Sequence, residues 1–569
     1  MKKILVYLIS VILFSSCNSI FDVFSTSSSN TTLKKDITLT IKNNTNNNYN
    51  AYAVFTNEEY YSYAGQIKIT SNTISSSLSN YTSSYSANIV SNNEIIKHPT
   101  FYDNGELKTE KTVDNNISAS IMANTASYSE GDTKEFNALY AGTGDYYTDK
   151  DDTNLNKKQA TLRKQVSNVS VTLENGGTSK RTLNIWVADD VWGTVTQEMI
   201  DTLADKFLQT GENNDIYDYV TSIYGDEWFE GDDKFSNTIY GNKEIDILIY
   251  NINEFNTSDA KVLGFFDSRH NYTDYEYSNQ EIMFFIDSGY FSLKEGGNWD
   301  ITYADNSGKG PATILSTLAH EFTHMIMFYQ KYYKQGISID TWINEMCAMI
   351  TEDIVADKLG ISNPINIRQG EFSMYGSSYP VNEWTTTTIH YSNKYFFGAF
   401  LLRNFGIGVF HDIVNNEYNG VTAIEKSLES NGYNVKFEDL LRYWGEAVIT
   451  SDNYSYSDIP YNYSDKNITY GGNTYTVYDI NVINNENYSN LTFYRLNDRS
   501  APDLDLGANI YYKLTPYSVD NNNIYTITIP YGVGMNIIIK DSLGNVKENK
   551  YFTADEIKNS SNFTVEILQ

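Results

Sequence analysis

The sequence is poor in cysteine, in histidine and in positive charge. Its 569 residues include 2 Cys and 6 His, and 41 Lys and Arg face 71 Asp and Glu, which gives a net charge of −30. A strongly acidic surface repels polyanions, so this balance argues against a nucleic acid partner and against adhesion to anionic lipid. No internal repeat and no phosphate-binding loop stands out. A hydrophobic content of 41% is ample for folded cores, and the length predicts more than one domain.

The first of the two cysteines follows an export-like segment. A basic start, Met1-Lys2-Lys3, precedes an apolar run over residues 4–14 and then Ser15-Ser16-Cys17. This pattern resembles a bacterial lipoprotein signal, with cleavage before Cys17 and a lipid on its new amino group. The alternative is an ordinary secretory peptide with an incidental cysteine. Both interpretations predict an exported protein without an intramolecular disulfide, because Cys347 would then be the remaining cysteine.

Two of the six histidines lie four residues apart in an apolar run, residues 312–328. If this run is helical, His320 and His324 stand one turn apart on one face and aim at one point. The pattern His-Glu-x-x-His is typical of metalloprotease helices, in which both histidines bind zinc and the glutamate, here Glu321, acts as general base. Shuffling this composition would produce it roughly 0.004 times per chain. The alternatives are a core helix with coincidental histidines and an inactive descendant of an enzyme.

A catalytic zinc site needs a third protein ligand, because it uses three protein ligands and leaves one position open. Residues 340–360 predict a second helix, with Asp340 as N-cap and Gly360 as its C-terminal stop. Its expected buried stripe consists of Ile343, Met346, Cys347, Ile350 and Ile354. Glu345 lies off that stripe and can point toward the first helix, so we predict it as the third ligand. The alternative for Glu345 is an ordinary solvent-exposed carboxylate.

These residues carry a resemblance to a known family. The His320 to His324 motif, with Trp342-Ile343-Asn344-Glu345 placing Glu345 21 positions after His324, resembles the gluzincin metallopeptidases. Within that clan the sequence is most similar to the hyicolysin family of bacterial neutral metallopeptidases, over residues 184–449. Segments 264–267, 278–287, 391–398 and 437–440 support the similarity. One departure is Met346, because many gluzincins have a small residue after the ligand glutamate.

The strand patterns and the resemblance together predict an α+β multidomain protein. Its expected parts are a signal peptide (1–16), a flexible tether (17–35), an all-β N-terminal domain (36–183), a zinc metallopeptidase domain (184–450) and a β-sandwich-like C-terminal domain (451–569). A hairpin is predicted between 169–173 and 182–187 through Asn175-Gly176-Gly177. The resemblance implies a zincin-like catalytic domain with a mixed sheet and an active-site helix, followed by a helical subdomain. It also suggests that the strand at 281–286 is the exposed edge strand that holds peptide substrates; the alternative is an ordinary strand of the sheet.

The predicted function is that of a zinc-dependent endopeptidase acting on extracellular or envelope proteins, anchored in the bacterial cell envelope through a lipid on Cys17. The outer membrane or the cell surface is its expected location. The resemblance implies a donor for the reaction's oxyanion from the later subdomain, and Tyr391 and Tyr395 are the candidates, with His390 in reserve. The expected partners are Zn²⁺, a protein or peptide substrate and the membrane. The alternative function is a surface-anchored binding protein or adhesin with a silent zinc site.

Overall fold

The structure is a computed structural model that describes most of the chain from residue 34 onward. The described residues are 34–45, 47–58, 66–71, 128–139, 155–211, 214–227, 239, 243–256, 261–273, 278–305, 308–361, 368–370, 372–373, 379–384, 388–453, 461–483, 491, 493–494, 504, 507–514 and 523–568. The expected signal peptide, Cys17 and nearly all of the expected tether lie outside these residues.

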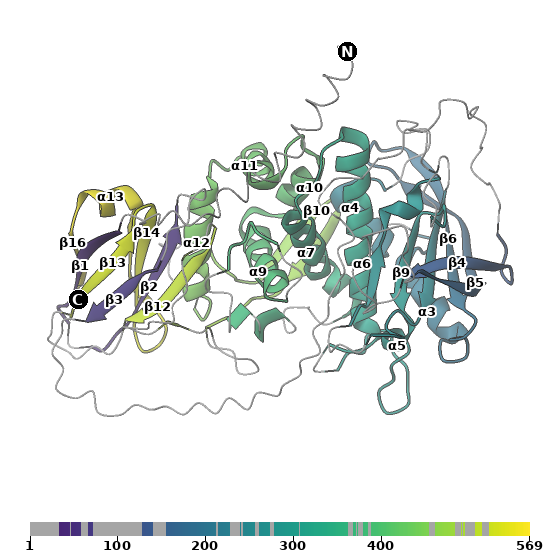
Figure 1. The fold of residues 1–569 in the computed structure, drawn as a ribbon, viewed down its shortest axis with the longest axis horizontal. Helices are drawn as coiled ribbons and strands as arrows, with labels where there is room; N and C mark the ends of the chain where they lie inside the picture. The colour runs from purple at the N-terminus through teal and green to yellow at the C-terminus, as the bar shows by residue number, and fades with distance from the viewer. Residues whose placement is uncertain are drawn as a thin grey trace, which may run out of the picture.

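A six-stranded mixed sheet forms one side of the central region (Figure 1). Its spatial order is β4 (Thr133–Leu139), β5 (Leu155–Thr172), β6 (Thr178–Ala188), β7 (Glu244–Tyr250), β9 (Met283–Asp287) and β8 (Gly264–Phe266). The pairs β6–β7 and β7–β9 are parallel, and the other neighbours are antiparallel. The predicted hairpin is confirmed as β5 and β6.

The identity of the edge strand differs from the prediction. Strand β9, which covers most of residues 281–286, lies between β7 and β8 and is therefore internal. The short strand β8 forms the edge instead, antiparallel to β9. Sequence pattern could not distinguish them, because both segments are short and mostly apolar, and neither pattern shows which strand has a second neighbour.

Helices cover the face of the sheet and continue away from it as a helical half. They are α3 (Gln197–Phe207), α4 (Ile216–Tyr224), the 3-10 helix η1 (Ser268–Asn271), α5 (Ser288–Phe291), α6 (Pro311–Met327), the π-helix η2 (Phe328–Tyr333), α7 (Thr341–Leu359), α9 (Thr388–Phe405), α10 (Ile407–Asn415), α11 (Gly420–Ser430) and α12 (Phe437–Ile449). Helix α6 packs against β8 and β9 on one side and against α7 on another, and α7 packs in turn against α9. Figure 1 shows α6 between the sheet and the helical half. The molecule is thus α+β, as predicted.

Strands from the two ends of the chain build one β-sandwich, which contradicts the expected all-β domain over 36–183. One sheet has the order β16 (Asn562–Ile567), β1 (Lys34–Asn43), β13 (Asn523–Pro530) and β3 (Lys68–Ser71). The other has the order β12 (Asn509–Leu514), β2 (Asn50–Asn57), β14 (Val533–Lys540) and β15 (Val546–Phe552). Figure 1 shows these purple and yellow strands side by side, with α13 (Ala554–Asn559) at the sandwich. Strands β4 to β6, which the same expected domain included, belong to the central sheet.

The sandwich is joined to the helical half by buried contacts at α12. Tyr52 and Val54 of β2 belong to the same hydrophobic core as helices α6 and α7. The side chain of Asn509 donates to the carbonyl of Leu441 at 2.9 Å, and that of Asn536 donates to Glu446 at 2.9 Å. The hairpin of β10 (Lys466–Tyr470) and β11 (Asn473–Val477), which the prediction placed in the C-terminal domain, packs against α7 instead.

Among the described residues, no single helix is both long enough and apolar enough to cross a membrane. Helices α9 and α10 together have the length and apolar composition of a span, but they are bent by 115° and nearly all of their apolar side chains are buried in the core.

Candidate functional site

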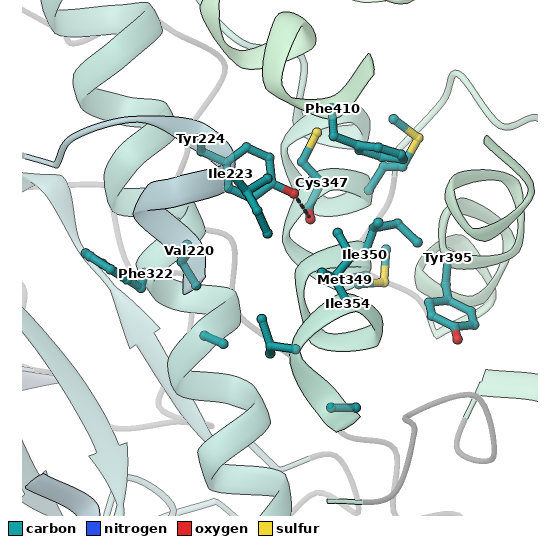
Figure 2. Close-up of a cluster of buried hydrophobic side chains, with 14 of the residues drawn as sticks. Val220, Ile223, Tyr224, Phe322, Cys347, Met349, Ile350, Ile354, Tyr395 and Phe410 are labelled. Atoms are coloured by element: carbon teal, nitrogen blue, oxygen red, sulfur yellow. Dashed lines mark hydrogen bonds between the residues drawn. The ribbon is translucent and has the colours of Figure 1, made fainter. Parts of the chain in front are cut away.

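The predicted motif helix is α6, and it is buried on every side. Every residue of α6 except Thr313 is buried. Phe322 points toward the central sheet (Figure 2), and its ring contacts those of Phe207 in α3 and Phe284 in β9. The opposite face carries His320 and His324 and is covered by α7. The helix therefore lacks the exposed polar face of an amphipathic surface helix, and its histidines lie in the interior.

Helix α7 begins and ends where the sequence predicts. Asp340 precedes its first residue, and Gly360 ends it in the left-handed conformation with φ of 70°. Asp340 does not cap the helix through its side chain; its Oδ1 accepts instead from the side chain of Asn419 at 2.8 Å. The predicted stripe is buried, and so are the residues around it, which include Glu345 with no exposed surface.

The structure brings His320, His324 and Glu345 together. The two Nε2 atoms of the histidines lie 3.1 Å apart. Glu345 Oε2 is 3.4 Å from Nε2 of His320, and Glu345 Oε1 is 3.5 Å from Nε2 of His324. Both carboxylate oxygens of Glu345 are buried and accept no hydrogen bond from any residue that the structure describes. Three potential ligand side chains therefore face one point between α6 and α7.

This arrangement fits a metal ion. Bonds of about 2.0–2.2 Å at tetrahedral angles separate ligand atoms by roughly 3.3–3.6 Å, and the three observed separations are close to that range. A buried carboxylate without donors is costly unless a cation compensates it. The three side chains of this cluster can therefore hold a divalent ion such as zinc.

The histidines are held in the protonation state that a metal requires. Burial lowers the pKa of His324 to about 4, and burial together with the nearby His324 lowers the pKa of His320 well below its usual value. Both imidazoles are thus neutral at pH 7, which is the state in which a ring nitrogen binds a metal. Burial raises the pKa of Glu345 well above its usual value, and the nearby Glu352 adds to this, so a cation here would favour its ionised form.

Each histidine is oriented through its second ring nitrogen. Nδ1 of His320 lies 2.8 Å from Glu352 Oε1, and Nδ1 of His324 lies 2.9 Å from Asn344 Oδ1. Glu352 also accepts from Ser316 Oγ at 2.8 Å and from Arg368 Nη2 at 2.8 Å. Hydrogen bonds to the far nitrogen fix the tautomer and the ring orientation of metal-binding histidines.

Glu321 lies beside this cluster, between α6 and the edge strand. Its Oε2 accepts a hydrogen bond from the backbone amide of Phe266 in β8 at 3.0 Å. Burial raises the pKa of Glu321 well above its usual value, and Glu345 contributes further. The backbone of β8 approaches α6 closely because Gly264 has no side chain: a Cβ there would lie 2.7 Å from the carbonyl oxygen of Phe285 and 3.1 Å from Thr317.

The aromatic candidates for oxyanion stabilisation lie on α9. The ring of Tyr391 packs edge to face against Trp384 with centroids 4.7 Å apart, and Arg368 lies 5.1 Å over the ring of Tyr395. Figure 2 shows Tyr395 on α9, across α7 from α6. Nδ1 of His390 bonds the carbonyl of Glu383 at 3.1 Å and lies 3.1 Å from Nζ of the buried Lys394.

Sequence reasoning missed the partners of the two histidines. Asn344 directly precedes Glu345, and Glu352 follows it by seven residues, two helical turns along the same face of α7. That spacing was a usable signal for Glu352. Arg368 carried no signal, because its approach to Glu352 depends on the path of the chain after α7.

Comparison with known proteins adds independent findings. Residues 156–540 match the sequence pattern of the family described as peptidase M30. The chain is also similar to the neutral metalloprotease ShpI of Staphylococcus hyicus, with 24% identity over 256 residues. That similarity covers 44% of this chain and 52% of the relative, so the chain spans about half the length of the curated relative that it matches.

Proposed function

The chain belongs to the peptidase M30 family, and from this premise we propose that it is a zinc-dependent endopeptidase with a gluzincin-type site in a zincin-like catalytic domain. The observation that carries the proposal is the convergence of His320, His324 and Glu345 on one point, with Glu321 beside them. The geometric match of these separations to a tetrahedral ion supports zinc.

The proposed ligands are His320, His324 and Glu345. A bound zinc ion supplies a Lewis acid that polarises the scissile carbonyl and makes water more acidic. Glu321 is the proposed general base, which takes a proton from the attacking water and later delivers it to the leaving amide nitrogen. The Phe266 amide supports this role because it fixes one carboxylate oxygen and thereby the plane of the carboxylate. The buried surroundings of Glu321 raise its proton affinity toward that of a useful base.

We place the peptide substrate along β8. This strand forms an edge of the central sheet, and it is bonded to the proposed base through Phe266. An extended peptide can add to such an edge through main-chain hydrogen bonds. That mode supports cleavage within a chain, because it needs no contact with a free substrate terminus.

Tyr391 and Tyr395 remain the proposed donors to the oxyanion, with His390 in reserve. Replacing either tyrosine with phenylalanine removes only a hydroxyl, so a donor would be revealed by a turnover roughly 10²- to 10³-fold lower with the zinc content unchanged. We further propose that the protein is lipid-anchored at Cys17 in the bacterial cell envelope and acts on extracellular or envelope proteins. Cys17→Ala should then release it from the membrane fraction.

The decisive experiment measures cleavage of a denatured protein and of a mixed peptide library by the purified chain, with metal analysis, in the presence and absence of a zinc chelator. We expect about one zinc per chain, chelator-sensitive internal cleavage, and an activity at least 10²-fold lower for Glu321→Gln with zinc retained. Glu429→Gln is the matched control, because its carboxylate is largely exposed and lies on α11. Zinc binding with equal cleavage by Glu321→Gln would contradict the role of Glu321. Zinc without any cleavage would favour a binding protein with a silent site.

A further inference from the structure

Glu352 is a buried carboxylate with three polar contacts beside the proposed metal site. It lies on α7 with 4% of its surface exposed. Its Oε1 is 2.8 Å from Nδ1 of His320 and 2.8 Å from Nη2 of Arg368, while its Oε2 accepts from Ser316 at 2.8 Å. Two contacts from α6 and one from the segment at Arg368 thus hold one carboxylate in one orientation.

The two histidines differ in the kind of partner they have. His324 bonds the neutral amide of Asn344, whereas His320 bonds a carboxylate that an arginine also binds. A carboxylate oxygen that accepts from an arginine acts as an acceptor toward its other neighbour too, so Nδ1 of His320 is the donor in this contact and Nε2 keeps its lone pair. That lone pair is on the atom 3.1 Å from His324 Nε2 and 3.4 Å from Glu345.

We propose that Glu352 is a positioning residue that presents Nε2 of His320 to the metal, and that Ser316 and Arg368 hold Glu352 in place for this task. The inference rests on the proposed metal site and goes beyond it by assigning the strength of zinc binding to a residue that touches neither metal nor substrate. Arg368 lies between Glu352 and the ring of Tyr395, so it connects this support to α9.

A purely structural ion pair between α7 and the segment at Arg368 is the competing explanation. The chain provides a matched control in the next residue of the same helix. Asp353 bonds Arg403 Nη1 at 2.9 Å, and neither side chain of that pair is exposed. Asp353→Asn therefore breaks a buried carboxylate–arginine pair on α7 without removing a partner of His320.

The test uses the full chain stripped of metal and measures zinc affinity by competition with a chromophoric chelator, alongside the thermal unfolding midpoint of the metal-free protein. Glu352→Ala should weaken zinc binding by about 10- to 100-fold. Glu352→Gln keeps an acceptor for Nδ1 but loses the charge, and it should fall between Glu352→Ala and the natural protein. Asp353→Asn should lower the unfolding midpoint and leave zinc affinity within about twofold.

The outcomes separate this inference from the proposed function. If the natural protein binds zinc and Glu352→Ala binds it equally tightly, the positioning role is wrong and the proposed function stands. Equal losses of zinc affinity in Glu352→Ala and Asp353→Asn would also overturn the inference, because they would report general loosening of α7. If the natural protein binds no zinc, the proposed function fails and the inference fails with it.

Discussion

Replacing Gly398 with alanine tests how closely α9 must approach the helix that carries Glu345. A Cβ at this position would lie 2.6 Å from Ile350 Cγ1, 2.9 Å from Met346 Cγ and 3.0 Å from Ile350 Cδ1. Carbon atoms pack at about 3.5–4.0 Å. The two helices must therefore separate by several tenths of an ångström, or these two side chains must leave their positions.

Two opposing effects set the magnitude. Overpacking of a core contact costs about 1–3 kcal/mol, whereas alanine in a helix interior is more favourable than glycine by about 1 kcal/mol. The net expectation is a loss of about 0–2 kcal/mol, concentrated in α7 and α9. Because Met346 follows Glu345 directly, the same displacement should also weaken zinc binding, since functional groups must be held to within roughly 0.5 Å.

Hydrogen exchange of the metal-free protein, read by mass spectrometry, measures this loss locally. A free-energy loss of 2 kcal/mol corresponds to exchange about 30-fold faster in peptides from α7 and α9. Gly370→Ala is the control, because a Cβ there would meet nothing within 4 Å. In an Ile350→Ala background, which removes two of the three close atoms, Gly398→Ala should be neutral or stabilising. Slower exchange in the single variant Gly398→Ala would refute the packing argument.

Three further predictions concern pH, metal and the sandwich. Burial lowers the pKa of His270 from 6.5 to about 4, so the unfolded chain binds this proton before the folded chain does as the pH falls. The stability that this histidine contributes above pH 6.5 should therefore be lost between pH 6.5 and 4. His270→Gln can still accept from the Asn279 amide, and it should flatten that part of a plot of unfolding midpoint against pH. Removing zinc with a chelator should leave the circular dichroism spectrum unchanged but lower the unfolding midpoint. Zinc added at 1,000 times its dissociation constant should raise the free energy of unfolding by about 4 kcal/mol, and an unfolding midpoint that does not change with zinc concentration would contradict the site. Gly445→Ala would place a Cβ 2.8 Å from Val54 and 3.2 Å from Asn509, so limited proteolysis should cut the sandwich strands faster, and an unchanged digestion pattern would show that α12 and the sandwich are not tightly docked.

Local signals in the sequence predicted the local structure around the site. The spacing of His320 and His324, and the boundaries of α7 at Asp340 and Gly360, follow from rules that act within one or two helical turns. The approach of Glu345 to the histidines was also predicted, because a catalytic zinc site needs a third protein ligand and Glu345 lies off the expected stripe of the second helix. The burial of α6 agrees with its apolar sequence, and α7 covers the face that carries the histidines.

Long-range pairing was beyond the reach of the sequence. The alternating pattern of β1 shows that one of its faces is buried, but it does not say that β13 and β16 are its neighbours. The same limit hid the edge position of β8 and the approach of Arg368 to Glu352. The departure at Met346 is explained only by the structure, because Gly398 on α9 leaves the room that the longer side chain needs.

The position of β1 in the sandwich has a consequence for how the protein is made. Lys42 pairs with Glu566, a partner 524 residues further along the chain. At a synthesis rate of about 5–20 residues per second, roughly half a minute to two minutes separate the emergence of these two segments. During that interval β1 and β2 have apolar faces but not all of their strand partners, so a holding chaperone or the export machinery would have to keep them from pairing with other chains. The sandwich is therefore the last part of the molecule to be completed, after the helices of the proposed metal site have all emerged.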